Sequence, residues 1–220
     1  MSPLLHLLVL KLVFTSFFGR DSEYYTTYLF AGTLLFTFFK EATNQGMSTL
    51  VSNASIISKI NLPKYLLLLS KNVSAIINFG LTLILFFIFA ALDGVPFTWK
   101  FFSLIYPILC LILINLGIGF ILSAMYVYFR DTKYLYDIFT LLLHYVSAIF
   151  YQVDRYPPQM QKLFLINPIY GCINYFRMVT IGGTIPSFGY HLYLFGYAAV
   201  LMGIGCWIYK KNNHTFIYYL

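Results

Sequence analysis

The side chains that could do acid–base, nucleophilic or metal chemistry are few and widely spaced in this sequence. Only seven Asp and Glu residues occur, none form a closely spaced pair inside an apolar segment, and the four His residues lie far apart. The motifs GxxxxGK[ST], HExxH and GxSxG are absent, so the chain does not cradle ATP phosphates itself and lacks the motifs of zinc proteases and serine hydrolases. Three cysteines without CxxC spacing predict neither a disulfide framework nor a zinc site. We therefore expect no catalytic residue, no metal and no cofactor held by this chain.

The composition excludes a soluble protein. Of the 220 residues, 60% are hydrophobic and 10% are charged, whereas a soluble domain carries about 25% charged residues. The net charge of +7 comes from basic residues that stand singly between apolar runs, so they cannot form the continuous basic face of a nucleic-acid-binding protein. We expect an all-α integral membrane protein with a single transmembrane domain over residues 1–220.

Six apolar runs predict six transmembrane helices. They are expected at residues 4–18, 26–41, 71–92, 101–129, 138–153 and 188–209. The fourth run gives the strongest signal, because it holds no charged side chain over 29 positions. The first run would make a helix of about 22 Å, which is short for a bilayer core of about 30 Å. Because it has no basic start and no cleavage site, it is predicted as a span and not as a signal peptide.

An even number of spans places both termini on one side of the membrane. Lys210 and Lys211 follow the last span, and basic residues near the ends of spans favour the cytoplasmic side. We therefore expect a multi-pass protein of the cytoplasmic (inner) membrane with both termini in the cytoplasm.

Two polar features are expected on the cytoplasmic side. Residues 42–64 follow the second span, and their apolar spacing predicts a short, weakly amphipathic helix that ends at Pro63. The apolar residues concerned are Met47, Leu50, Val51, Ala54 and Ile57. Arg130 and Asp131 end the fourth span. On the residues alone, these features are either contact sites for a partner or an ordinary interfacial loop and a stop-transfer charge pair.

A third segment, residues 154–186, is expected on the outer side. It contains YPPQMQKLFLINPIYGCINYFR, in which apolar residues alternate with prolines and charges. Because this stretch is too polar to span and too apolar to stay in water, we expect short re-entrant helices between the fifth and sixth spans. Arg177 is expected to pair with Asp154, to meet a lipid or pyrophosphate group, or to snorkel to the interface.

The order of these motifs resembles that of a known family. The motifs are an aromatic-rich stretch at residues 25–39 with Gly32, Asn53 followed by KINLPK at 59–64, Arg130 and Asp131, residues 147–151 before Pro157, and Asn167 and Pro168 ahead of Arg177. Over about residues 25–183 the chain resembles the permease subunit of ATP-binding-cassette exporters of cell-surface polysaccharides. Family members begin with a cytoplasmic interface helix, whereas only three residues precede the first span here, so the start is truncated or the helix is dispensable.

The resemblance implies a transporter subunit and not an enzyme. It implies a homodimer with nucleotide-binding ATPase subunits that bind ATP and Mg²⁺ on the cytoplasmic side. The expected cargo is a lipid-linked polysaccharide (O-antigen, capsule or teichoic acid) that moves outward. ATPase coupling is expected at Asn53, Lys59, Pro63, Lys64, Arg130 and Asp131. The outer gate and substrate path are expected to include Lys11, Pro157, Asn167, Pro168 and Arg177.

The sequence leaves other readings open. Lys11 either faces the path or snorkels to an interface. Aromatic rings that could stack on sugars are Phe36, Phe39, Tyr126, Tyr145 and Tyr151. The alternative functions are a drug or lipid efflux permease of the same superfamily and a membrane-embedded glycan or lipid enzyme. The polar side chains that could serve such an enzyme are Asp154, Arg155, Lys162 and Arg177.

Overall fold

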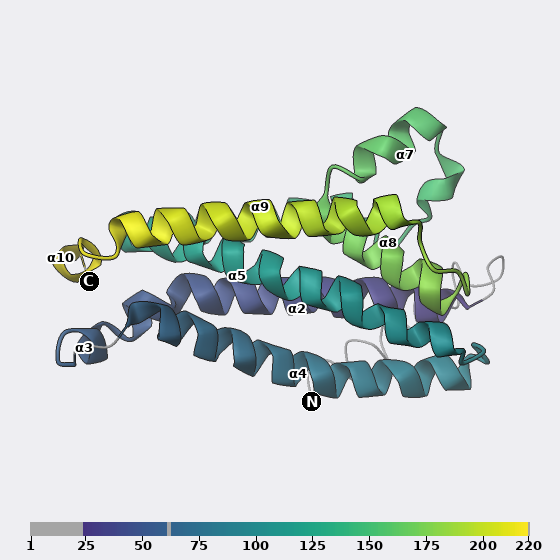
Figure 1. The fold of residues 1–220 in the computed structure, drawn as a ribbon, viewed down its shortest axis with the longest axis horizontal. Coiled ribbons are helices and arrows are strands. Elements are labelled where there is room, and N and C mark those ends of the chain that lie inside the picture. The colour runs from purple at the N-terminus through teal and green to yellow at the C-terminus, as the bar shows by residue number, and fades with distance from the viewer. Residues whose placement is uncertain (1–23, 61–62, 220) are drawn as a thin grey trace.

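The computed structural model describes residues 24–60 and 63–219 of the chain (Figure 1). This part consists of helices, turns and loops and contains no strand, so the predicted all-α class is confirmed. The first predicted span, residues 4–18 with Lys11, lies outside the described residues.

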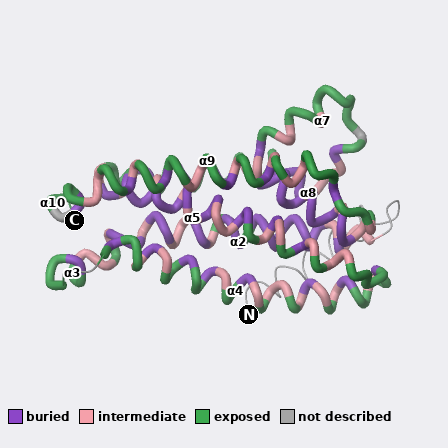
Figure 2. The backbone as a smooth tube through the Cα atoms, in the orientation of Figure 1, coloured by how far each residue is buried: buried purple, intermediate pink, exposed green. Residues whose placement is uncertain are grey.

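Four long helices lie alongside one another in the described part of the chain (Figure 1). They are α2 (Tyr25–Ser52), α4 (Lys64–Leu92), α5 (Ile105–Tyr128, preceded by a 3-10 turn at Trp99–Leu104) and α9 (Phe188–Asn212). Helix α5 is apolar on all sides and packs against α2 and α9, as a buried helix does. Figure 2 shows that buried residues follow α2 and α5, whereas α4 and α9 expose their outer faces.

The backbones of the long helices approach each other at glycines. A Cβ added to Gly117 of α5 would lie 2.6 Å from the backbone carbonyl of Leu201 on α9. A Cβ on Gly46 of α2 would lie 3.2 Å from the Cα of Gly119. Small residues at helix contacts are typical of membrane proteins, where lipid tails are as apolar as the side chains and close packing drives association.

The shorter helices lie toward the two ends of the bundle. At one end are α3 (Ala54–Ile57) and α10 (Phe216–Tyr219), and toward the other are α7 (Pro158–Phe164) and α8 (Pro168–Thr180) (Figure 1). Helix α8 is largely buried and packs against α2 and α5, whereas α7 stands off from the bundle. Helix α6 (Thr132–Val146) and a 3-10 turn (Val153–Arg155) complete the described chain.

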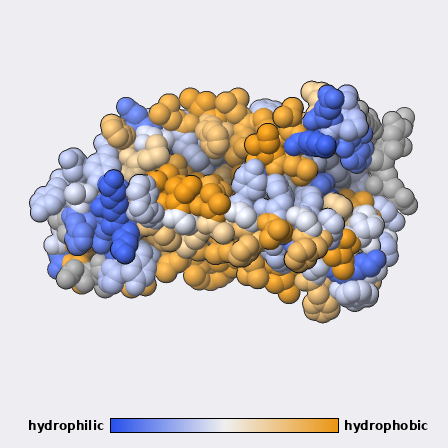
Figure 3. All heavy atoms as spheres, turned by 45° about the horizontal axis from the view of Figure 1, so that its top comes forward, coloured by the Kyte–Doolittle hydropathy of each residue, from blue (hydrophilic) through white to orange (hydrophobic). Residues whose placement is uncertain are grey.

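Three helical segments among the described residues are long and apolar enough to cross a membrane. They are Lys64–Leu92, Trp99–Tyr128 and Phe188–Asn212. Helix α2 has the length but is polar after Phe39, and α6 has only 15 residues. The six-span count and the re-entrant placement of α7 and α8 therefore stay predictions. On the face in Figure 3, apolar side chains cover the middle of the bundle and hydrophilic ones gather toward its ends.

Several helix ends differ from those expected. Helix α2 continues through Lys40 and Glu41 to Ser52, so Met47 and Leu50 belong to it and only residues 54–57 form a separate short helix. The charged pair does not end the helix because the buried apolar face continues beyond it.

The bounds of two further helices also differ. Helix α4 begins at Lys64, directly after Pro63, and not at residue 71. The helix expected at residues 138–153 instead covers 132–146, and the chain turns at Ala148, where φ is 48°.

Candidate functional site

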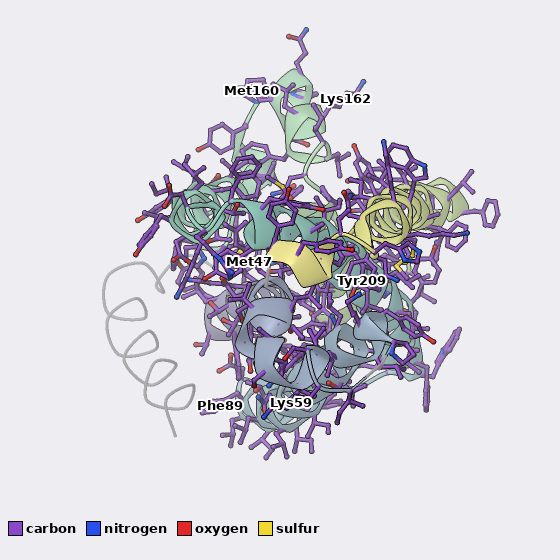
Figure 4. The ribbon with its side chains drawn as sticks, turned by 90° about the vertical axis from the view of Figure 1, so that its left-hand side faces the viewer. Met47, Lys59, Phe89, Met160, Lys162 and Tyr209 are labelled. Carbon is purple, nitrogen blue, oxygen red and sulfur yellow. The ribbon has the colours of Figure 1, made fainter. Side chains whose placement is uncertain are left out.

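The residues expected to couple to an ATPase gather at one end of the bundle. Helix α3, the start of α4, the end of α5, and helix α10 after the end of α9 meet there (Figure 1). Their apolar side chains form one cluster, made of Leu50, Ile57, Leu68, Phe120, Ala124, Val127, Tyr209 and Phe216. Figure 4 looks onto this end and shows Met47 and Tyr209 within the bundle. We call it the α3 end.

Lys64 lies inside the α3 end and does not face outward. Its side chain is only 9% exposed, and its Nζ donates a hydrogen bond of 2.7 Å to the carbonyl oxygen of Asn213, just after α9. Tyr128 Oη donates to the side chain of Asn212 at 3.2 Å. Lys64 therefore ties the start of α4 to the end of α9.

The other expected coupling residues are accessible. Lys59, Pro63, Arg130 and Asp131 are exposed. Asn53 is half-buried between α2 and α3, where its Nδ2 donates to the carbonyl of Thr49 at 2.8 Å. Further exposed cations at this end are Lys133, Lys210 and Lys211. The α3 end thus presents a cationic surface.

At the opposite end, Asn167 and Pro168 begin helix α8. Asn167 Oδ1 accepts a hydrogen bond of 3.0 Å from the backbone N–H of Ile169, and Pro168 occupies the first turn. These are the residue types preferred at a helix N-terminus. The Nδ2 of Asn167 donates to Ser147 Oγ at 3.0 Å. Pro157 directly precedes α7, whose Met160 and Lys162 project away from the bundle in Figure 4.

Arg177 is buried in this second end, with 6% of its surface exposed. Its guanidinium donates to the carbonyl oxygens of Tyr28, Ala148 and Ile149 over 2.8–3.2 Å, and it lies 3.4 Å from the ring centroid of Tyr28. Asp154 is exposed and forms no ion pair with Arg177 within the described residues. Of the alternatives for Arg177, pairing with Asp154 is therefore not the one found, because backbone carbonyls supply the acceptors.

The five candidate aromatic residues have different surroundings. Phe36 and Phe39 are buried in the core, where Phe36 contacts His144 at 4.7 Å between ring centroids. Tyr145 is 59% exposed. Tyr126 and Tyr151 are half-buried. Only the three tyrosines retain surface that a ligand could reach.

A polar face on α2 was not recognised from the sequence. Thr37, Lys40, Glu41, Asn44 and Ser48 are exposed or half-buried, and their i, i+3, i+4, i+7, i+11 spacing places them on one side of the helix. We call these five residues the α2 polar face. Testing polar residues for the same periodicity as apolar ones would have found it.

The α2 polar face extends from the middle of the bundle toward the α3 end. Glu41 Oε1 accepts hydrogen bonds from Gln45 Nε2 at 3.0 Å and from Asn78 Nδ2 at 2.8 Å. Asn78 is the fifteenth of the 29 residues of α4, one of the candidate spans. In residues 24–60 and 63–219 no three His, Cys, Asp or Glu side chains gather as a metal would require.

Long apolar helices, glycine contacts and polar ends define a multi-pass membrane protein. The family model described as "ABC-2 type transporter" matches residues 1–181. The chain therefore belongs to the ABC-2 type transporter family, as its motifs predicted.

Curated relatives cover almost the whole chain. The chain is 21% identical over 221 residues to the "O-antigen export system permease protein RfbA" of Klebsiella pneumoniae, which covers 98% of this chain and 83% of the relative. It is 22% identical over 220 residues to a protein of the same name from Myxococcus xanthus, with 98% and 84% covered.

Proposed function

We propose that this chain is the membrane-spanning subunit of an exporter that moves a lipid-linked cell-surface polysaccharide outward across the cytoplasmic membrane. The cargo would be an O-antigen, a capsule polysaccharide or a teichoic acid. The family match and the names of the relatives support an export permease.

The observation that carries this proposal is the α2 polar face. It extends for about 16 Å at about 1.5 Å per residue, from the level of the middle of a candidate span toward the α3 end. Side chains of this kind are costly against lipid tails and instead line cavities or face polar partners. Their mixture of hydrogen-bond donors and acceptors suits the hydroxyl groups of a sugar chain.

A second copy of the chain would complete the path. A two-fold axis brings the same surface of each subunit together, so two α2 polar faces would line one shared passage. The subunit partner we propose is therefore another copy of this chain.

The energy would come from a separate nucleotide-binding subunit that binds ATP and Mg²⁺. The α3 end would form its docking surface, with Asn53, Lys59, Pro63, Arg130 and Asp131 at or near the contact. The exposed cations of this end favour a cytoplasmic location. The C-terminus and the docking surface would then share the cytoplasmic side.

Coupling is tested by co-purification with the nucleotide-binding subunit. Charge reversal at exposed Lys59 combined with Pro63→Gly should reduce recovery of the ATPase and surface polysaccharide several-fold, with normal membrane insertion. Lys162→Glu on α7 is the matched control, because this lysine is also exposed but lies at the opposite end. Unchanged recovery and export would contradict docking at α3.

The path is tested by making the α2 polar face apolar. Asn44→Leu with Ser48→Leu should reduce surface polysaccharide roughly tenfold or more at equal protein level, because a passage lined by leucine repels a hydrated chain. Thr98→Leu, at an exposed turn outside this face, should leave export unchanged. Unaffected polysaccharide would refute the path, and loss of drug or lipid efflux instead would favour the alternative cargo.

A further inference from the structure

The chain leaves helix α6 through a segment whose backbone is held by side chains from other helices. We call residues 147–151 the α6 exit. Arg177 donates to the carbonyls of Ala148 at 2.8 Å and Ile149 at 3.0 Å. The next two carbonyls, of residues 150 and 151, accept from Tyr25 Oη at 3.2 Å and Tyr28 Oη at 2.7 Å. Four consecutive carbonyls are therefore satisfied by three side chains of α2 and α8.

The α6 exit begins at the C-terminal cap of helix α6, where the backbone N–H groups of Ser147 and Ala148 donate to the carbonyls of Leu143 and Tyr145 at 2.9 and 3.4 Å. The last carbonyls of a helix have no partner within it, and a glycine in a left-handed conformation commonly completes the cap. Here the left-handed residue is Ala148, with φ of 48°, and it is fully buried. Because non-glycine residues disfavour this conformation, surrounding contacts must hold it.

Arg177 is itself fixed from several sides. Its Nε and Nη2 donate to the Tyr28 carbonyl at 3.2 and 3.1 Å, and its guanidinium covers the Tyr28 ring. A Cβ on Gly32 would lie 2.6 Å from Nη2 and 3.3 Å from the side chain of Ile149. The missing side chain of Gly32 therefore leaves the space that the guanidinium occupies.

The same contacts argue against a ligand-binding role for this arginine. Four hydrogen bonds to carbonyl oxygens direct both Nη atoms and Nε toward the protein. The planar guanidinium suits such fixed, multiple contacts, whereas a lysine offers one ammonium group. A lipid phosphate could reach Arg177 only after the α6 exit had moved.

We propose that Arg177, seated against Gly32 and assisted by Tyr25 and Tyr28, is a positioning residue that fixes the α6 exit against α2 and α8. The exit leads directly into the 3-10 turn and α7, so its position sets where α7 stands. The positioning role rests on the contacts alone. Its consequence, that α7 closes the outer end of the path, rests on the proposed function.

The experiment is hydrogen–deuterium exchange on the full chain in lipid nanodiscs, without cargo. Arg177→Lys should raise amide exchange in residues 147–156 roughly tenfold or more, because local opening follows the loss of several charge-assisted hydrogen bonds. Gly32→Ala should have the same effect by displacing the guanidinium. Gly80→Ala is the matched control, since a Cβ there meets nothing within 4 Å, and it should leave this peptide unchanged.

The double variant Gly32→Ala with Arg177→Lys separates positioning from general destabilisation. Lysine has no Nη2 for the new Cβ to strike, and the Cβ then meets only Ile149, at 3.3 Å from its side chain, so the double variant should exchange only slightly faster than Arg177→Lys alone. Tyr25→Phe and Tyr28→Phe remove one hydroxyl each and should raise exchange in the same peptide by a smaller factor, even if the arginine variant does not fold.

Any of three results would overturn the proposal. The first is unchanged exchange at residues 147–156 in Arg177→Lys and both Phe variants. The second is an increase spread evenly over α2, α5 and α9, and the third is additive effects of the two single variants Gly32→Ala and Arg177→Lys. Because no cargo is used, these outcomes do not depend on polysaccharide export, and failure of export in the α2 variants would leave this inference standing.

Discussion

At the scale of single residues, a buried cation in this protein binds backbone carbonyls instead of carboxylates. Arg177 contacts carbonyls of α2 and the α6 exit, and Lys64 contacts the carbonyl of Asn213. The Asn213 carbonyl lies just after the end of α9, where carbonyls without a partner in the helix are strong acceptors and the negative end of the helix dipole favours a cation. The positive charge of these residues is thus used for joining helices.

Lys64→Met is expected to lower the stability of the protein, because Lys64 is buried and its Nζ is hydrogen-bonded. It leaves the Asn213 carbonyl without its donor, and an unsatisfied buried acceptor costs about 1–3 kcal/mol. The midpoint of thermal unfolding of the purified protein should fall. Lys71→Met is the control, because Lys71 is exposed and lies about two turns further along α4; it should change the midpoint little. An equal fall in both variants would contradict the role of Lys64 in joining α4 to the end of α9.

At the scale of helices, the sequence predicted the apolar lengths well and their ends poorly. Hydropathy located α4, α5 and α9 because each contains a long uncharged run. Hydropathy predicted that the second span weakens at Lys40, yet α2 continues through this residue. Lys40 lies on the exposed side of the helix, and the buried side stays largely apolar beyond it. Hydropathy also placed residues 147–151 in a span, since nothing in their own sequence reveals that Arg177, 26 or more residues later, holds them in a turn.

The sequence singled out several residues of the candidate site but could not predict their contacts. The spacing identified α3, Asn167 and Arg177 as unusual, and the structure gives Asn167 a capping role. It could not reveal the contacts of Lys64, because Asn213 lies 149 residues away in sequence. Such partners depend on how α4 and α9 pack, which hydropathy does not encode.

The contact between α5 and α9 gives a prediction at this scale. A Cβ on Gly205 would press into the backbone of Gly117, with 2.9 Å to its Cα. Gly205→Ala should therefore separate the helices and lower stability by about 1–3 kcal/mol, as overpacking does. Gly203→Ala lies on the same helix with nothing within 4 Å of its Cβ, and should be neutral or slightly stabilising. The midpoints of thermal unfolding of both variants test this prediction. Similar midpoints would show that the close contact between Gly205 and Gly117 is dispensable.

At the scale of the whole molecule, the two ends differ in charge and construction. The α3 end gathers exposed lysines and arginine around short helices, whereas the other end carries α7 and the α6 exit. An exporter driven from the cytoplasm requires its two ends to face different compartments, one toward the ATPase and one toward the outside. The proposed cytoplasmic location of the α3 end rests on its exposed cations, which favour that side of the membrane.

Thiol labelling in intact cells tests that assignment. In a background with the exposed Cys206 replaced by Ser, Gln159→Cys and Gln161→Cys in α7 should react with a membrane-impermeant maleimide from outside. Ile173→Cys should react far less, because Ile173 is fully buried, and Lys59→Cys should react only after the membrane is permeabilised. Labelling of Lys59→Cys in intact cells, with Gln159→Cys protected, would show that the orientation in the membrane is the reverse of the proposed one. That result would place α3 where no ATPase can reach it, and both the docking surface and the outer position of α7 would have to be abandoned.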